Sequence, residues 1–382
     1  MEYHQSSQIP TLSYLENEDH PVFETLVQQI LHLLNSKLVF SDIIIHQNSP
    51  LMLRQPKGLV AVTDSPITKE ELEEFFDVIE PNWMQRIASR AFDRSIDLHT
   101  ARIRANCFRF QGGKRIGCVI RRFPKEPIAL SELGLWDDER EFARLTSGLV
   151  LIIGDTCQGK STTIASILDE INRQRSGHII TIEDPVEFVH GNIKCLVNQR
   201  EVGQHTKSFK AALRAALRED PDIVLVGEMR DLETIAIAIE TAETGHLVFG
   251  TLHTTTATST VDRIIDQFPA DRQAQIRVML SESLKGVIAQ VLLPKIGGGR
   301  VAAHEVLLGT TAVSAIIRDG KTFQLPSVMQ TSKGQGMITM NDSLMQLVQK
   351  RLVEPKAAYV KAVDKAGLLA MFKAANIPTD FK

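Results

Sequence analysis

A loop bounded by glycines, from Gly154 to Thr162, carries the residues best suited to hold phosphate; its sequence is GDTCQGKST. It satisfies the pattern G-x-x-x-x-G-K-[ST], with an apolar strand before it and helical spacing after it. Backbone N–H groups of such a loop and the positive end of the next helix bind phosphate oxygens. We therefore expect Lys160 to reach the terminal phosphates of a nucleotide and Ser161 to ligate Mg²⁺. A chance match of a glycine-rich turn is the alternative, and both flanks argue against it. The candidate contacts are Gly154, Asp155, Thr156, Cys157, Gln158, Gly159, Lys160, Ser161 and Thr162.

A second apolar strand is predicted in PDIVLVGEMRD, and its C-terminal end delivers Glu228 and Arg230. An open parallel sheet binds ligands at the C-terminal ends of its strands, so we expect both residues beside the loop. A carboxylate there can orient a water for attack on a γ-phosphate, or hold a metal ion through water. A strand that ends in Glu is by itself more often simply solvated. The catalytic interpretation of Glu228 therefore depends on its pairing with the phosphate loop.

Three acidic residues crowd around a proline in TIEDPVEFVH, at another predicted strand end. Glu183, Asp184 and Glu187 would repel one another unless a cation or hydrogen-bond donors compensate, which favours the neighbourhood of a Mg²⁺ ion. The alternative is the N-terminus of a helix or turn, where acids are favoured in any case.

Two histidines bracket the strand predicted in TGHLVFGTLHT, where a sheet exposes residues to a bound ligand. A lone histidine is usually structural, and only the neighbouring motifs make His246 and His253 candidates.

From Gly148 onwards apolar strands alternate with amphipathic helices, which is typical of a parallel sheet covered on both faces. The predicted strands are GLVLIIG, HIITIE, KCLVNQ, DIVLVGE and HLVFGTL, and the clearest helices are SFKAALRAALRED and LETIAIAIETAETG. A hairpin, LPKIGGGRVAAHEVL, and further helices complete the chain.

The N-terminal part reads as a smaller α/β domain. A helix is predicted in VFETLVQQILHLL, and strands in FSDIIIH and LMLRQPKGLVAV. Two further strands, joined at Gly112 and Gly113, carry four arginines, namely Arg102, Arg104, Arg121 and Arg122. The predicted organisation is a flexible arm over 1–20, the small domain over 21–124, a linker over 125–140 and the main domain over 141–382.

The composition is that of an ordinary globular protein, with 43% hydrophobic residues and a net charge of -3. This balance argues against a general nucleic-acid binder. The four cysteines form no CxxC pair and no metal-ligand spacing. No stretch approaches the roughly 18 apolar residues of a membrane span, so any membrane association is expected to be peripheral or through a partner.

Together and in this order, the motifs resemble those of the secretion ATPases, motors with a RecA-like core, and within them the type IV pilus retraction ATPases. The stretch IITIEDPVEFVH is similar to that family's Asp box, DPDIVLVGEMRD to its atypical Walker B motif and ETGHLVFGTLHT to its His box. The resemblance extends to FSDIIIH, RIRANCFR and VIRRFP.

This resemblance implies an α/β fold in which a PAS-like N-terminal domain is joined to a RecA-like P-loop ATPase domain. It implies a cytoplasmic homohexamer that hydrolyses ATP with Mg²⁺ and works peripherally at the inner face of the cytoplasmic membrane. An inner-membrane platform protein, and optionally a paralogous retraction ATPase, would be its partners. The implied catalytic residues are Glu228, Glu183, Arg102 and Arg121, the two arginines reaching the phosphates from the N-terminal domain. The implied nucleotide contacts outside the loop are Asp184, Glu187, Arg230, His246 and His253.

Two departures from the family pattern leave an alternative function open. Asp155, Cys157 and Gln158 stand where the family loop has Pro, Gly and Ser, and a positive φ at Cys157 would strain the backbone. In TAVSAIIRDG, Ser314 and Ala315 replace the Arg-Asn pair of a helix associated with retraction. The alternative that these departures leave open is an accessory paralogue of the retraction motor with weak ATPase activity.

Pilus assembly and secretion ATPases are a further alternative. They generally carry a larger N-terminal region and often a CxxC zinc insert, neither of which this sequence has. DNA translocation would rest on the shared core architecture alone, which does not fix function.

Overall fold

The computed structural model describes residues 25–36, 38–55, 58–98, 102–124, 126–133 and 137–380. It divides into two compact units, Met1–Lys125 and Glu126–Lys382. The arm predicted over 1–20 lies outside the described residues. Within the predicted linker, Leu130 in the short helix η1 (Leu130–Glu132) is 3% exposed and belongs to a core of the second unit.

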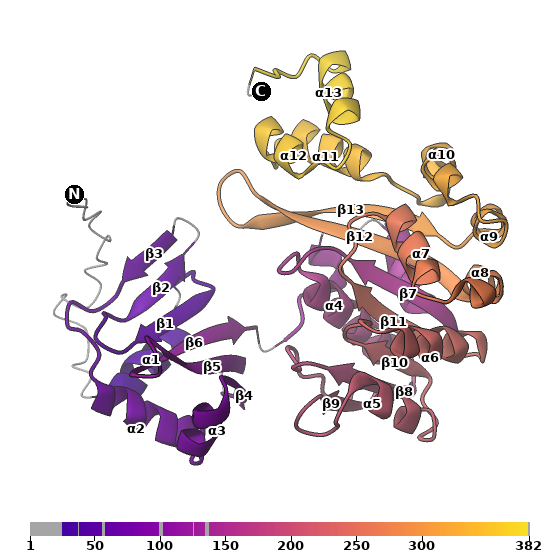
Figure 1. Cartoon of the computed structure of the whole chain (residues 1–382). Coiled ribbons are helices and arrows are strands. Elements are labelled where there is room, and N and C mark those ends of the chain that lie inside the picture. The colour runs from indigo at the N-terminus through magenta and orange to yellow at the C-terminus, as the bar shows by residue number, and fades with distance from the viewer. Residues whose placement is uncertain are drawn as a thin grey trace. The chain divides into compact units, whose positions relative to one another are not determined.

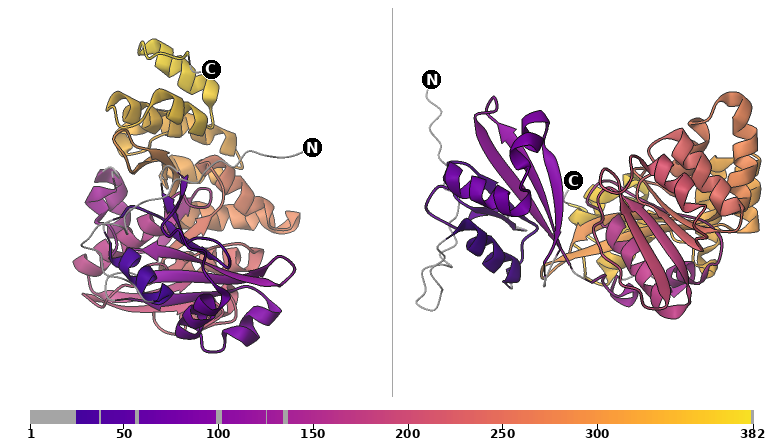
Figure 2. Two further views of the ribbon diagram at one scale, coloured as in Figure 1. Left: turned by 90° about the vertical axis from the view of Figure 1, so that its left-hand side faces the viewer. Right: turned by 90° about the horizontal axis from the view of Figure 1, so that it is seen from below.

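The first unit is a six-stranded antiparallel sheet with the order β3-β2-β1-β6-β5-β4. Its strands are β1 (Asp42–His46), β2 (Met52–Gln55), β3 (Gly58–Ala61), β4 (Phe92–Asp97), β5 (Arg102–Phe110) and β6 (Arg115–Phe123). The helices α1 (Leu26–Asn35), α2 (Lys69–Ile79) and α3 (Trp83–Ser89) cover one face of it (Figures 1 and 2). Buried Ile103, Ala105 and Cys107 alternate with half-buried Arg102 and Arg104, so the arginines share the face opposite the helices.

The second unit is built on a seven-stranded sheet with the order β13-β12-β7-β11-β10-β8-β9. The five predicted strands are confirmed as β7 (Gly148–Ile153), β8 (Gly177–Glu183), β9 (Cys195–Glu201), β10 (Ile223–Val226) and β11 (Leu247–Leu252). They are parallel to one another, and β12 (Leu284–Pro294) joins them in the same direction beside β7. Only β13 (Arg300–Leu308), at the edge, is antiparallel.

Every residue of β7 is buried, because helices cover the sheet on both sides (Figure 1). Val150 and Ile152 point to the core that includes α4 (Lys160–Gln174). Leu149 and Leu151 point to the core formed with α5 (Phe209–Ala216), α6 (Leu232–Glu243), α7 (Ala257–Asp266) and α8 (Ala270–Ser283). The continuous apolar run of β7 thus follows from burial on two faces, and the predicted parallel sheet covered on both faces is confirmed.

The C-terminal part differs from its prediction in one respect that matters for the site. The predicted hairpin begins at Leu284, ten residues before Pro294, and its first strand is a full member of the central sheet. Short helices follow it: α9 (Thr311–Arg318), α10 (Leu325–Thr331), α11 (Met340–Gln349), α12 (Pro355–Lys361) and α13 (Lys365–Ala374). Among the helices of the described ranges, none combines the length and the apolar character needed to cross a membrane.

Candidate nucleotide site

The loop after β7 has the backbone of a phosphate-binding loop. Gly154 has a φ of 143° and Gly159 a φ of 87°, values that side chains with a Cβ rarely adopt. Gly159 is also the N-cap of α4, so the N–H groups of the first helical turn are available at the loop. These backbone groups fit the phosphate oxygens of a nucleotide.

Lys160, the first residue of α4, curls back over the loop. Its Nζ donates to the carbonyl oxygens of Gly154 at 2.6 Å and Asp155 at 2.9 Å. Burial lowers the pKa of Lys160, whereas the negative charges of Glu228 and Asp155 oppose that shift. The lysine is 9% exposed and lies where phosphate charge would compensate its desolvation.

Cys157 has the positive φ that, by the sequence analysis, would strain the backbone. Its φ is +64°, in the left-handed region, and its side chain is exposed. A residue other than glycine held there costs on the order of 1–3 kcal/mol. The surrounding contacts must therefore hold the loop in this conformation.

Glu228 follows β10 and lies in a chain of polar contacts at the C-terminal edge of the sheet. Its carboxylate contacts Nη2 of Arg230 at 2.5 Å and Nε2 of His253 at 2.9 Å. The other ring nitrogen of His253 lies 3.5 Å from the Nζ of Lys160. Burial alone would raise the pKa of Glu228, but the hydrogen bonds and charges of Arg230 and His253 prevail and lower it. Glu228 is thus an ionised carboxylate connected to the phosphate loop.

The three acids of the TIEDPVE stretch differ in environment. Glu183, at the end of β8, accepts hydrogen bonds from Thr181 at 2.7 Å and Gln199 at 3.1 Å, and burial raises its pKa to about 7. Asp184 is exposed and lines a hollow of about 550 Å³ together with Arg230. The charge of Glu187 acts on Lys160. All three lie at the same edge of the sheet as the loop.

No group of three His, Cys, Asp or Glu side chains in the described part of the chain could hold a metal ion by itself. This arrangement still fits Mg²⁺, which keeps several waters and takes further oxygens from nucleotide phosphates. Ser161, exposed in the first turn of α4, is the hydroxyl next to the loop, and Glu228 is the nearby ionised carboxylate.

The structure separates the two predicted histidines. His253 follows β11 at the edge that carries the loop, but His246 precedes β11, and its carbonyl oxygen accepts from the N–H of Gly148 at the start of β7. A six-residue strand spans roughly 20 Å at about 3.3 Å per residue. The Nδ1 of His246 lies 3.1 Å from the carbonyl oxygen of Thr241. His246 therefore lies at the opposite edge of the sheet from the loop of its own chain, and its predicted contact with a nucleotide stays a prediction.

Arg102 and Arg121 belong to the first unit, where both contact carboxylates. Nη1 of Arg102 lies 2.7 Å from Asp97, and Nε of Arg121 lies 2.8 Å from Asp42. The Asp42 carboxylate is 3% exposed and also accepts from Ser41 at 2.7 Å. The predicted approach of Arg102 and Arg121 to the phosphates stays a prediction.

Residues on β12 were missing from the predicted site. Gln290 and Leu292 contact the phosphate loop through hydrogen bonds with Gln158. One polar residue inside the apolar run VIAQVLLP was the only signal that the sequence offered.

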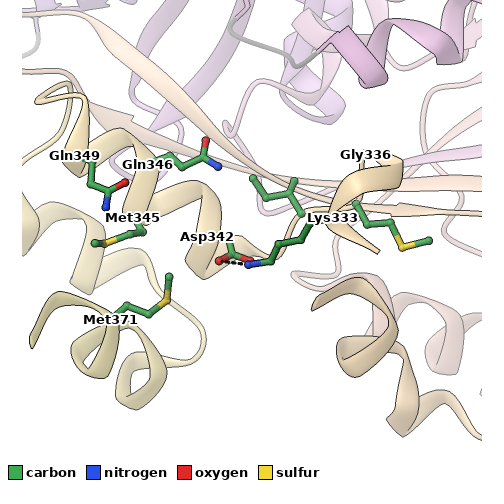
Figure 3. Close-up of a pocket in the computed structure, with 9 residues that line it drawn as sticks. Lys333, Gly336, Asp342, Met345, Gln346, Gln349 and Met371 are labelled. Atoms are coloured by element: carbon green, nitrogen blue, oxygen red, sulfur yellow. Dashed lines mark ion pairs between the residues drawn. The ribbon is translucent and has the colours of Figure 1, made fainter. Parts of the chain in front are cut away.

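The C-terminal helices enclose a separate hollow of about 270 Å³ (Figure 3). Met345 of α11 and Met371 of α13 line it, and Lys333 pairs with Asp342 across it at 2.8 Å. None of its lining residues comes from the phosphate loop.

A parallel sheet, a glycine-bounded loop with its lysine and an ionised strand-end carboxylate define a P-loop nucleotide hydrolase with a RecA-like core. The family model described as "Type II/IV secretion system protein" matches residues 92–351. The chain belongs to this family, and it is a nucleotide-binding ATPase.

Named relatives agree with this assignment. The chain is 53% identical over 262 residues to the type IV pilus retraction ATPase PilT of Pseudomonas aeruginosa, which covers 69% of this chain and 76% of that one. It is 36% identical over 335 residues to the type IV pilus ATPase PilU of the same organism, covering 87% and 88%. The crystal structure of the pilus retraction motor PilT with bound ADP matches with a TM-score of 0.83 and 42% identity, over 91% of this chain and 99% of that chain. The predicted resemblance to the retraction ATPases is confirmed.

Proposed function

We propose that this protein is an ATP-driven motor of type IV pilus retraction. The observation that carries the proposal is the contact chain from Glu228 through His253 to Lys160, which connects an ionised carboxylate to the phosphate loop. A relative named as a pilus retraction ATPase, 53% identical over 262 residues, supports the biological role.

In this proposal the loop residues from Gly154 to Thr162 bind the phosphates, with Lys160 at the terminal ones. Glu228 orients the attacking water and accepts its proton, a role that an ionised carboxylate can fill. Ser161 would hold Mg²⁺, which offsets phosphate charge when bound. His253 and Arg230 position Glu228.

Other predicted residues keep more distant roles. Asp184 and Glu187 would lie near the Mg²⁺ ion when it is bound, and Glu183, whose pKa burial raises to about 7, would be able to take up or release a proton near neutral pH. Arg102 and Arg121 reach the phosphates when the two domains close, which would connect nucleotide state to domain motion.

The assembled motor would be a homohexamer at the cytoplasmic face of the inner membrane. It would act on a platform protein of the pilus machine, as the family resemblance implies. ATP held between neighbouring protomers would drive them open and closed, provided that ATP and its products favour different domain arrangements.

Phosphate release from the purified full-length protein tests the enzymatic part. Glu228→Gln keeps the shape of the side chain and removes the base, so we expect a loss of about 100- to 10,000-fold in kcat. Lys160→Ala is the binding-defective control. Equal phosphate release by wild type and both variants at every ATP concentration would exclude the proposal.

An accessory role beside a paralogous retraction motor is the second candidate. The relative named PilU aligns over 87% of this chain, a longer match than the 69% for the relative named PilT. Ser314 and Ala315 on α9 also depart from the retraction helix. A deletion strain distinguishes the roles: abundant immobile pili indicate the motor, whereas a defect that appears only under load or without the paralogue indicates the accessory protein.

A role in pilus assembly or secretion has weaker support. The chain is 38% identical to the type II secretion ATPase E of Vibrio cholerae, but it spans only 39% of that protein. Absence of surface pili in the deletion strain would favour this role.

A further inference from the structure

The phosphate loop rests directly on strand β12. A Cβ added to Gly154 would lie 2.5 Å from the carbonyl oxygen of Gln290, and one added to Gly159 would lie 2.8 Å from the Nε2 of Gln290. Real Cβ contacts are essentially never this short, and the obstacle at Gly154 is backbone, so a glycine is needed there for the loop to approach the strand; at Gly159 the obstacle is the amide end of a side chain, and the positive φ of 87° is the stronger reason for glycine. The loop is therefore packed against the backbone and the side chain of residue 290.

Three hydrogen bonds join the loop and α4 to this strand. The Oε1 of Gln158 accepts from the N–H of Leu292 at 2.7 Å, and the Nε2 of Gln290 donates to the carbonyl oxygen of Gln158 at 2.8 Å. The Oε1 of Gln290 accepts from the hydroxyl of Thr163 at 2.6 Å. Gln290 is 3% exposed and Thr163 is 1% exposed, so water competes little for the third bond. The two glutamines thus fasten the loop and the first turn of α4 to one strand.

We propose that Gln158 and Gln290 are positioning residues for nucleotide binding, a role that rests on the proposed binding of ATP at this loop. Cys157, with its φ of +64°, precedes Gln158 directly, so the loop carries strain where the glutamine bonds begin. The bonds hold the backbone N–H groups in the binding conformation before the nucleotide arrives. Such preorganisation increases affinity because less ordering is needed on binding.

The side-chain length at position 158 is specific to this role. The Oε1 of glutamine is four bonds from its Cα, whereas the hydroxyl of a serine is two bonds away and does not extend to Leu292. Gln158 thus makes a loop-to-strand hydrogen bond that a serine at the same position would not make.

Kinetics and ADP binding of the full-length protein test this role. Gln158→Met keeps the side-chain length and removes the amide, and Gln290→Leu removes two hydrogen bonds. Gln335→Met, on the exposed short helix η4 (Lys333–Gln335), is the matched control. The KM for ATP, kcat, the Kd for a fluorescent ADP analogue and the Tm are measured for each.

We expect Gln158→Met to raise both KM and the ADP Kd about five- to tenfold, the equivalent of about one net hydrogen bond. Gln290→Leu should raise them further, while kcat at saturation changes less than about twofold because Glu228 and Lys160 remain. In the double variant the increase in Kd should be smaller than the product of the single effects, because both residues hold the same loop.

Two results would overturn the inference. One is a KM and an ADP Kd equal to those of Gln335→Met, and the other is a lower Tm with unchanged affinity, which would make the bonds purely structural. If wild type and Lys160→Ala release no phosphate, the proposed ATPase role fails, yet the ADP titration still decides whether the glutamines position the loop.

Discussion

His253 lies against Glu228, with its Nε2 2.9 Å from the carboxylate oxygen, while its other ring nitrogen lies 3.5 Å from the Nζ of Lys160. One imidazole therefore contacts both the carboxylate at the end of β10 and the lysine of the phosphate loop. A histidine can donate to a carboxylate through one nitrogen and respond to a charge at the other. This geometry makes His253 the residue best placed to relate phosphate binding at Lys160 to the orientation of Glu228.

The first prediction concerns His253→Gln. Without the ring, Glu228 loses the contact with His253 and keeps its ion pair with Arg230, and we expect kcat for ATP hydrolysis to fall about 10- to 100-fold if Glu228 has its proposed role. The ADP Kd should change less than kcat, since the loop is intact. His246→Gln is the comparison, because that residue lies at the opposite end of β11. Equal losses of kcat in the two variants would contradict this interpretation.

Glu183 should make the stability of the protein depend on pH. Its pKa is raised from 4.5 to about 7, so the folded chain retains a proton that the unfolded chain releases, and stability falls as pH rises through this window. Glu183→Gln removes that cost. We expect the free energy of unfolding of this variant to exceed that of wild type by on the order of 1–3 kcal/mol above pH 7, and to equal it near pH 4. Thermal unfolding across this range measures the difference. Parallel curves for variant and wild type would disprove it.

His304 should make the protein less stable as pH falls, the opposite of the effect of Glu183. It is 1% exposed on β13, its Nε2 has no hydrogen-bond partner among the described residues, and burial lowers its pKa from 6.5 to about 4. Below pH 6.5 the imidazole of His304 takes up a proton in the unfolded chain but stays neutral in the folded chain. The free energy of unfolding therefore falls as pH decreases to about 4. His304→Leu should flatten this loss, which is on the order of 1–3 kcal/mol. Each variant is compared with wild type at the same pH, and an unchanged slope would contradict the assignment.

Gly154→Ala tests the contact between the loop and β12. The new Cβ would lie 2.5 Å from the carbonyl oxygen of Gln290, at a φ of 143°. Overpacking of this kind costs about 1–3 kcal/mol, so we expect ADP affinity to fall about 5- to 100-fold. Gly58→Ala is the matched control, since Gly58 has a φ of 133° with no described atom within 4 Å of its added Cβ. Equal ADP affinity in the two variants would show that the contact is unimportant.

Local sequence patterns were sufficient to predict the central strands and the phosphate loop. The apolar runs of β7 and β10 and the glycine-bounded loop were recognisable because strand periodicity and the conformational needs of glycine act over a few residues. The placement of Glu228 beside the loop followed from one further rule, that parallel strands bring their C-terminal ends to one edge. By the same rule His246, which precedes its strand, lies at the opposite edge of the sheet from the loop of its own chain.

Contacts between residues far apart in the sequence could not be predicted from these local rules. Gln290 is 132 residues from Gln158 in sequence, and nothing local indicates that the strand after α8 pairs with β7 and runs beneath the loop. The pairing of Arg121 with buried Asp42 likewise joins residues 79 apart. The sequence by itself determined a phosphate-loop pattern, a strand that ends in Glu228 and a parallel sheet, because short-range sterics and hydrophobic periodicity encode them. Only the tertiary structure decided what holds the loop, because strand order and register result from packing on both faces of the sheet.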